Sequence, residues 1–261
     1  MSIINYDLLN ENIEKYRVDF EGGIFGYVVI DGFLNKSVVQ DILDELPDPN
    51  SSNINKSRDY VFAKNKFEKS EFYDFGNSLS ALFKDLISSE FSDILKKITG
   101  ENVFVDSSFH GGGIHQGGEG SFLDMHADFN YHPIKDKWFR NLNILVYLNP
   151  DWEKEYGGEL QLTNKNTGKK AAIEPILNRC VIMHTRDYTL HGYNKINFPS
   201  GTFRRSIAAY AYTQVDHTED VRSTTWYPND AGIFKSLLGR HWPKIVKIKN
   251  IFFGSSTGKN K

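Results

Sequence analysis

Hydrophobic positions in the first hundred residues follow helical spacing for most of their length. An apolar run at 24–31 predicts a strand, and Ser37 then predicts the cap of a helix that continues to residue 46. Over 77–99 apolar residues recur every three or four positions, which predicts a long amphipathic helix with Gly100 suited to cap its end. The stretch 48–57 is rich in Asn, Ser and Pro and predicts a surface loop. This part of the chain is therefore expected to be a largely helical support.

Beyond Gly100 the pattern changes to short runs of strand-forming residues separated by turn signals. The turns are marked by pairs such as Gly-Gly, Asn-Pro and Asp-Trp. The strand-like runs are 103–105, 121–126, 142–148, 159–162, 181–184 and 204–212. Many short strands at this spacing favour a double-sheet jelly roll or a related barrel. The predicted fold class is therefore mainly β with supporting helices, a jelly-roll core preceded by an N-terminal α/β support.

The chain is expected to form a single domain, because 261 residues is an ordinary size for one all-β unit. Within it we expect a support over 1–100, a β core over 101–217 and a basic extension over 218–261. From position 231 onward the chain has no acidic residue, whereas its basic residues are Lys235, Arg240, Lys244, Lys247, Lys249, Lys259 and Lys261. A solvated basic end and a segment that docks on an acidic partner are both consistent with this composition.

Charge and cysteine content narrow the function classes. The net charge of -2 argues against a general nucleic-acid binder, which needs a surplus of Lys and Arg. Cys180 is the sole cysteine and lies in an apolar run, so we expect a buried thiol and a reducing compartment. The first residues lack the pattern of a signal peptide, and no stretch has the length of a membrane span. A cytoplasmic protein with no membrane partner is therefore expected; the oligomeric state is left open.

A possible metal site is marked by His126 and Asp128. On a strand, residues two apart point to the same face about 6.6 Å from each other, so an imidazole and a carboxylate could grip one ion. A third ligand is available in His191, which follows Asp128 by 63 residues. Two histidines and one carboxylate with open positions form the facial triad of non-haem Fe(II) oxygenases. Asp124, just before His126, is an alternative source of the carboxylate.

An arginine on the strand after His191 suggests an anionic co-substrate. Around Arg204 the residues alternate, so that Arg204 and Arg205 would face opposite sides of a strand. A guanidinium binds a carboxylate through two parallel hydrogen bonds, a geometry that lysine cannot reproduce. A dicarboxylate co-substrate would use such a group, and a surface salt bridge is the alternative use.

Five motifs in order resemble the prolyl 4-hydroxylase branch of the Fe(II)/2-oxoglutarate-dependent oxygenase superfamily. The resemblance covers about residues 104 to 213, and single motifs in it are soft. The motifs are His126-Ala-Asp128, Tyr147-Leu-Asn-Pro-Asp-Trp152, Gly157-Gly-Glu-Leu160, His191-Gly and Arg204-x-Ser206. The resemblance implies a double-stranded β-helix core, which is the jelly-roll type that the strand pattern favours.

Roles for individual residues follow from the resemblance. It implies that His126, Asp128 and His191 bind iron and form the catalytic centre. It implies that Arg204 and Tyr147 bind 2-oxoglutarate, and the spacing after His191 keeps Arg205 open as an alternative. Further co-substrate positions are Gln116 and Ser206, and the predicted substrate-binding residues are Arg140, Asn143, Tyr131 and Tyr210.

The resemblance implies a 2-oxoglutarate-dependent dioxygenase, a hydroxylase of an unactivated C–H bond. Its cofactors would be Fe(II), 2-oxoglutarate and O2, with ascorbate as an optional reductant, and its products would include succinate and CO2. The primary substrate is left open between a small molecule and a prolyl or other residue of a protein. Asp128 disfavours a halogenase, because halogenating relatives lose this carboxylate. A cupin-type metal protein without 2-oxoglutarate and a jelly-roll binding module are the alternatives.

Overall fold

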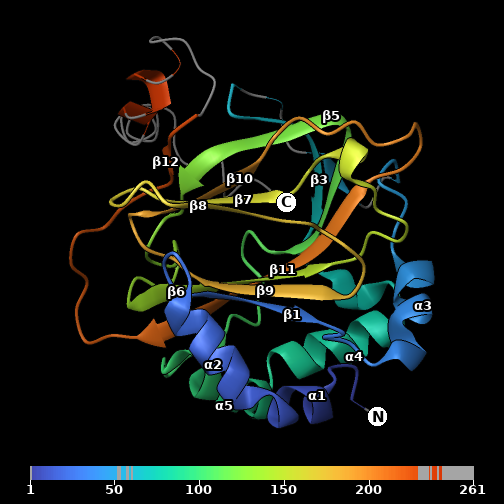
Figure 1. Cartoon of the computed structure of the whole chain (residues 1–261), viewed down its shortest axis with the longest axis horizontal. Helices are drawn as coiled ribbons and strands as arrows, with labels where there is room; N and C mark the ends of the chain where they lie inside the picture. The colour runs from blue at the N-terminus through green and yellow to red at the C-terminus, as the bar shows by residue number, and fades with distance from the viewer. Residues whose placement is uncertain are drawn as a thin grey trace.

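The strands of the chain form one antiparallel sheet that curls over itself into two layers (Figure 1). The computed structural model describes residues 2–51, 54–56, 59, 61–228, 235, 237–239 and 241–242. Along the sheet the strands follow the order β1 (Tyr27–Asp31), β9 (Arg179–His184), β6 (Trp138–Tyr147), β11 (Arg204–Gln214), β5 (Gly113–Ala127), β10 (Thr189–Tyr193), β7 (Leu160–Asn164) and β8 (Lys170–Ile173). The shorter strands β2 (Asn55–Lys56), β3 (Ala63–Lys69), β4 (Phe104–Val105) and β12 (Thr225–Trp226) pair at its margins.

Strand β5 belongs to both layers and joins them. Its first residues, Gly113 to Gly117, pair with β11, whereas Leu123 and His126 pair with β10. The glycine-rich stretch between these two parts includes Gly120, whose φ of 68° lies in the left-handed region that glycine favours. Such a bend lets one strand turn a corner and pass from one layer to the other.

The helices cover the outer face of the β1-β9-β6-β11 layer (Figure 1). They are α1 (Tyr6–Glu11), α2 (Ile13–Gly22), α3 (Lys36–Glu45), α4 (Asn77–Leu86) and α5 (Ser89–Thr99), with short 3-10 turns at η1 (Phe72–Asp74) and η2 (Lys154–Tyr156). Ile144, Ile182 and Ile207 point from the sheet toward the helices and are fully or almost fully buried. Burying one such side chain stabilises the fold by about 1.5–3 kcal/mol, so this layer is the main core.

The predicted helices are present with different ends. The first begins at Lys36 after Asn35, so the prediction that Ser37 caps this helix is wrong. The predicted 77–99 helix is broken, because the Ser88 side chain accepts a hydrogen bond from the backbone N–H of Phe91 (3.1 Å) and starts a new helix there. Gly100 caps that second helix at a φ of 76°, as predicted.

The predicted fold class is confirmed, since the chain is mostly a curled antiparallel sheet with few helices. Each predicted strand overlaps an observed one. The pattern missed β2, β3, β8, β10 and β12, and it missed α1 and α2. The first hundred residues are therefore more than a helical support, because β1 and β3 are part of the sheet.

The C-terminal segment is only partly described. Of the basic residues predicted there, Lys235 is described, and its ammonium pairs with the Asp124 carboxylate at 2.7 Å. The others lie outside the described residues. Among the helices that the structure describes, none combines the length and apolar character needed to cross a membrane.

Candidate metal centre

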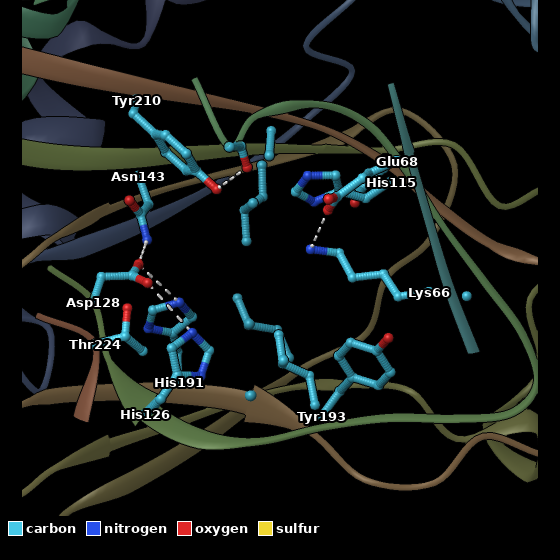
Figure 2. Close-up of a pocket in the computed structure, with 18 of the residues that line it drawn as sticks. Lys66, Glu68, His115, His126, Asp128, Asn143, His191, Tyr193, Tyr210 and Thr224 are labelled. Atoms are coloured by element: carbon cyan, nitrogen blue, oxygen red, sulfur yellow. Dashed lines mark hydrogen bonds and ion pairs between the residues drawn. The ribbon is translucent and has the colours of Figure 1, made fainter. Parts of the chain in front are cut away.

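Three predicted ligands meet on one side of a cavity (Figure 2). His126 on β5 and His191 on β10 are direct cross-strand partners, and Asp128 follows immediately after β5. One ligand atom from each residue lies within 4.8 Å of the other two. The pairing register explains this convergence, because directly opposed residues of an antiparallel pair point to the same face.

The two imidazoles direct the same nitrogen toward Asp128. The Nδ1 atom of His126 is hydrogen-bonded to the backbone oxygen of Asp124 at 2.8 Å, which leaves Nε2 facing the carboxylate at 3.4 Å. The Nε2 atom of His191 lies 3.3 Å from the other carboxylate oxygen. A backbone carbonyl behind one ring nitrogen is the usual support for a metal-binding histidine.

Asp128 is held from three directions. Its Oδ2 atom accepts a hydrogen bond from the Asn143 amide (2.9 Å) and pairs with the Arg140 guanidinium (3.0 Å). Arg222 donates from Nε and Nη2 to the backbone oxygen of Asp128 at 3.1 and 2.8 Å. Burial by itself opposes ionisation, but the charge of the Arg140 guanidinium holds the pKa of this carboxyl well below its usual range.

A β-bulge brings Arg140 and Asn143 to the same face of β6. Residues three apart on a regular strand point to opposite faces. The pairing of β11 with β6 shifts between Ala211 and Tyr212, which leaves Asn141 as the extra residue. As a result the Arg140 guanidinium donates to the Asn143 side-chain oxygen from Nε (3.0 Å) and Nη2 (2.8 Å).

The donor set fits a divalent transition metal. A metal needs its histidines neutral and its carboxylate ionised. Burial and the neighbouring His126 lower the pKa of His191, so its ring is neutral near pH 7, and Asp128 is ionised. Two imidazoles and one carboxylate on one side of an open cavity are the ligands that non-haem Fe(II) prefers.

Arg204 and Tyr147 lie together deeper in the same cavity, which has a volume of about 290 Å³. The Arg204 Nη2 atom is 3.4 Å from the Tyr147 hydroxyl, and the guanidinium lies 4.2 Å from the centre of the Tyr193 ring. Its Nε atom donates to the Gly158 backbone oxygen at 2.6 Å. Gly158 has a φ of 81°, and a Cβ there would lie 3.0 Å from the Arg204 side chain, so glycine is required for this approach.

The sheet register decides between Arg204 and Arg205. Arg204 pairs with Gly117 and faces the cavity, whereas Arg205 pairs with Gln116 and faces away from it. The Arg205 Nε atom donates to the Gln116 side-chain oxygen at 3.1 Å, and the Gln116 amide donates to the Pro47 oxygen at 3.0 Å. Gln116 is also part of the cavity lining, but both polar atoms of its side chain already have protein partners. Its co-substrate role stays a prediction.

Of the other predicted site residues, four line the cavity and one does not. Ser206, Tyr210, Arg140 and Asn143 line the cavity. Tyr131 does not, because its ring packs on Phe139 and its hydroxyl accepts a hydrogen bond from the backbone N–H of Glu219 (3.2 Å). The prediction that Tyr131 contacts the substrate is therefore corrected, because Tyr131 is not part of the cavity lining.

Two residues near the candidate ligands in the sequence do not join the cluster. The Asp124 carboxylate pairs with Lys235 rather than joining His126 and His191, so Asp124 is not the carboxylate of the cluster. His132 is also outside the cluster: it is 3% exposed, and its Nδ1 atom accepts hydrogen bonds from two loop amides at 3.1 and 2.9 Å.

Several residues of the cavity wall were not predicted from the sequence. Trp226 of β12 pairs with His126, and its ring lies 4.8 Å from that imidazole. Lys66, Glu68 and His115 line the opposite wall. No strand was predicted at β3, because Ala63–Lys69 alternates lysines and a glutamate with few apolar residues and lacks the signal of a half-buried strand.

Fold and site together define a jelly-roll protein with a candidate centre of two histidines and one carboxylate. Residues 112–212 match the family model described as the 2OG-Fe(II) oxygenase superfamily. No curated protein matches the chain by sequence.

Solved prolyl hydroxylases and a related oxygenase share the fold. A Trichoplax adhaerens prolyl hydroxylase, solved with a peptide fragment of the hypoxia inducible factor oxygen degradation domain, is 18% identical with a TM-score of 0.58, covering 80% of this chain and 93% of its own. A Pseudomonas putida prolyl-4-hydroxylase is 14% identical with a TM-score of 0.54, covering 78% of this chain and 100% of its own. A 2OG-Fe(II) oxygenase family oxidoreductase from Burkholderia pseudomallei is 13% identical with a TM-score of 0.52. The match covers 81% of this chain and 93% of the Burkholderia chain. The match to the family model supports an oxygenase function, and the solved structures show that the fold is shared.

Proposed function

We propose that this chain is an Fe(II)- and 2-oxoglutarate-dependent dioxygenase that hydroxylates a C–H bond of its primary substrate. His126, Asp128 and His191 would hold the iron. Arg204, together with Tyr147, would bind the distal carboxylate of 2-oxoglutarate. Bound iron would supply the activation of O2, coupled to decarboxylation of 2-oxoglutarate to succinate and CO2.

The observation that carries the proposal is the buried guanidinium of Arg204 in the same cavity as the candidate ligands. Arg204 is 7% exposed, and among the described residues no carboxylate lies within salt-bridge distance of it. An unpaired buried cation is costly, and a carboxylate ligand removes this cost by two charge-assisted hydrogen bonds. A cupin-type protein that does not use 2-oxoglutarate would have no need of this group.

The remaining residues have positioning roles in this proposal. Asn143 and Arg140 fix the Asp128 carboxylate, and the Asp124 carbonyl fixes the His126 ring. Leu145, Leu160 and Ala208 form an apolar wall of the cavity. Such a wall reduces water around the co-substrate and strengthens its ionic contact with Arg204.

The test is an anaerobic titration with Fe(II) and then 2-oxoglutarate, followed by visible absorption. The wild-type protein should develop a metal-to-ligand charge-transfer band, and His126→Ala should not. Arg204→Leu should retain Fe(II) and raise the Kd for 2-oxoglutarate by about tenfold to a hundredfold, the effect of losing a bidentate ionic contact. Arg205→Leu is the matched control on the same strand and should behave as wild type.

Two outcomes would contradict the proposal. Folded, Fe(II)-loaded protein that gives no charge-transfer band with 2-oxoglutarate would favour the cupin-type alternative. Equal 2-oxoglutarate affinity in wild type and Arg204→Leu would remove Arg204 from the site.

A further inference from the structure

A second charged cluster lines the cavity across from the candidate iron ligands. It consists of Lys66 and Glu68 from β3 and His115 from β5, and we refer to it as the β3 cluster. Figure 2 shows its side chains on one side of the cavity and His126, Asp128 and His191 on the other. No role in the proposed iron or 2-oxoglutarate site falls to these residues.

The pairing register directs the β3 cluster inward. Glu68 pairs with His115, and His115 pairs with Ser206 in the adjacent strand, so these three side chains share one face. Lys66 lies two residues before Glu68 and therefore points to the same face. The intervening Phe67 points outward and packs edge-on against Phe203, with ring centres 6.1 Å apart.

The cluster offers both signs of charge and a neutral acceptor. The Lys66 ammonium is 3.2 Å from the Glu68 carboxylate, and an ammonium has three N–H donors, of which this contact uses one. The Nε2 atom of His115 is buried, and it has no hydrogen-bond partner among the described residues. Burial and the charge of Lys66 lower the pKa of His115 to about 3, so the ring is neutral.

An apolar substrate would fit this wall poorly. Only 22% of the Lys66 side chain and 37% of the Glu68 side chain are exposed, and both residues line the cavity. A ligand without charges would remove the remaining water from the ion pair and replace none of its hydrogen bonds, which costs free energy. A ligand with a carboxylate and an ammonium would satisfy both partners.

We propose that the primary substrate is a free amino acid, whose α-carboxylate binds Lys66 and whose α-ammonium binds Glu68 and His115. This inference rests on the proposed oxygenase function. In this proposal Arg204 binds the co-substrate and Arg140 pairs with Asp128, so Lys66 is the cavity cation that can bind a substrate carboxylate. A residue within a peptide chain carries neither the α-carboxylate nor the α-ammonium, and it would leave the β3 cluster unused. The cavity of about 290 Å³ must also admit 2-oxoglutarate, which favours a small partner.

The experiment begins with the anaerobic Fe(II)–2-oxoglutarate complex of the whole chain. Each proteinogenic L-amino acid is added separately, and its N-acetyl amide is added in parallel. Shifts of the charge-transfer band report binding, and succinate release after admission of O2 reports coupled turnover. At least one free amino acid should shift the band and raise succinate release by about tenfold, whereas its blocked form should do neither, because loss of both charges removes two charge-assisted contacts.

Three variants test which residues bind the amino acid. Lys66→Met and Glu68→Gln should each raise the Kd for that amino acid by about tenfold or more, with the Kd for 2-oxoglutarate unchanged. Lys64→Met is the matched control, since Lys64 lies on the same strand but is exposed and does not line the cavity. It should bind the amino acid as wild type does.

The outcomes separate this inference from the proposed function. If the band forms but no free amino acid shifts it, or if blocked forms act equally well, the free-amino-acid substrate is wrong while the oxygenase proposal stands. Equal losses in Lys64→Met and Lys66→Met would also overturn it. If the band itself does not form, both proposals fail.

Discussion

Two buried guanidinium groups in the cavity are balanced in different ways. Arg140 is 1% exposed, pairs with Asp128, and stacks 3.4 Å from the centre of the Tyr210 ring. Arg204 has a phenol and a backbone carbonyl as partners but no carboxylate among the described residues. The charge of Arg140 is thus taken up by the protein, while that of Arg204 remains for a ligand. The predicted substrate role of Arg140 is therefore replaced, in our proposal, by positioning of Asp128.

Arg222 supports the candidate centre through the main chain rather than through a ligand side chain. We expect Arg222→Ala to lower the affinity for Fe(II) by about tenfold, the lower end of the effect of removing an outer partner of a metal ligand. The reason is that the guanidinium holds the backbone oxygen of Asp128, which sets the position of that carboxylate. Isothermal titration with Fe(II) under anaerobic conditions measures this affinity.

The control for Arg222 is Arg179→Ala. Arg179 makes a similar two-nitrogen contact, at 2.6 and 3.0 Å, with the carboxylate of Asp31 on the edge strand β1. Its loss should leave the Fe(II) affinity unchanged. Wild-type affinity in Arg222→Ala would show that the Asp128 backbone is fixed without this contact.

Single-residue roles were predictable from sequence only where a motif gave them. His126, Asp128 and His191 meet as predicted, because two of them lie two residues apart and the third pairs across the sheet. Arg204 and Arg205 could not be separated, since a shift of one residue in register exchanges the two faces of a strand. His115, the neighbour of Gln116, also lines the cavity and was given no role from the sequence, while the side-chain amide of Gln116 is bonded to Pro47.

At the level of elements, the approach of β10 to β5 determines whether the two histidines meet. Their register is interrupted between His191 and Tyr193, and Gly192 lies at the interruption. A Cβ on Gly192 would lie 2.5 Å from the backbone oxygen of Leu123. The strands can come this close only because position 192 has no side chain. Strand β10 was missed from sequence because it is five residues long and contains a single aliphatic residue, Leu190.

Gly192→Ala should therefore separate the two strands beside His191. We expect the free energy of unfolding of the metal-free protein to fall by about 1–3 kcal/mol, the usual cost of overpacking. The Fe(II) affinity should fall as well, because His191 moves away from His126. Urea denaturation in EDTA measures the first effect and anaerobic Fe(II) titration the second.

Gly22→Ala is the control substitution. Gly22 ends α2, and a Cβ there meets no heavy atom within 4 Å. Its unfolding free energy should stay within about 0.5 kcal/mol of wild type, as for an ordinary surface change. A Gly192→Ala protein as stable and as metal-binding as Gly22→Ala would contradict the close-approach argument.

Over the whole molecule, the helix-covered layer supplies the core and the other layer supplies most of the candidate ligands. The fold class was predictable because the strands from β4 onward have clear turn signals between them. The contribution of β3 was not, because its inward residues are charged and face a cavity rather than a core. Sequence patterns detect burial in apolar surroundings, so a strand that serves a polar cavity escapes them.

The reaction rate of the Cys180 thiol can show whether the two layers of the sheet unfold together. Cys180 is fully buried on β9, between Ile30 of β1 and Val146 of β6, and burial raises the pKa of its thiol. The thiol should react with a disulfide reagent only after β9 is exposed. A metal bound by His126, Asp128 and His191 in the other layer should slow this reaction if β9 opens only when the whole sheet unfolds.

We therefore expect Mn(II), used as a redox-stable substitute for Fe(II), to slow the labelling of Cys180. At a concentration about one hundred times its Kd, it should slow labelling by about a hundredfold, because only the folded state binds the metal. In His126→Ala the slowing should disappear, which excludes an effect of the metal on the reagent. Labelling that Mn(II) leaves unchanged in the wild-type protein would mean that β1, β9 and β6 open while the metal centre stays intact. The covered layer would then be a separate unit of folding, with its own opening free energy.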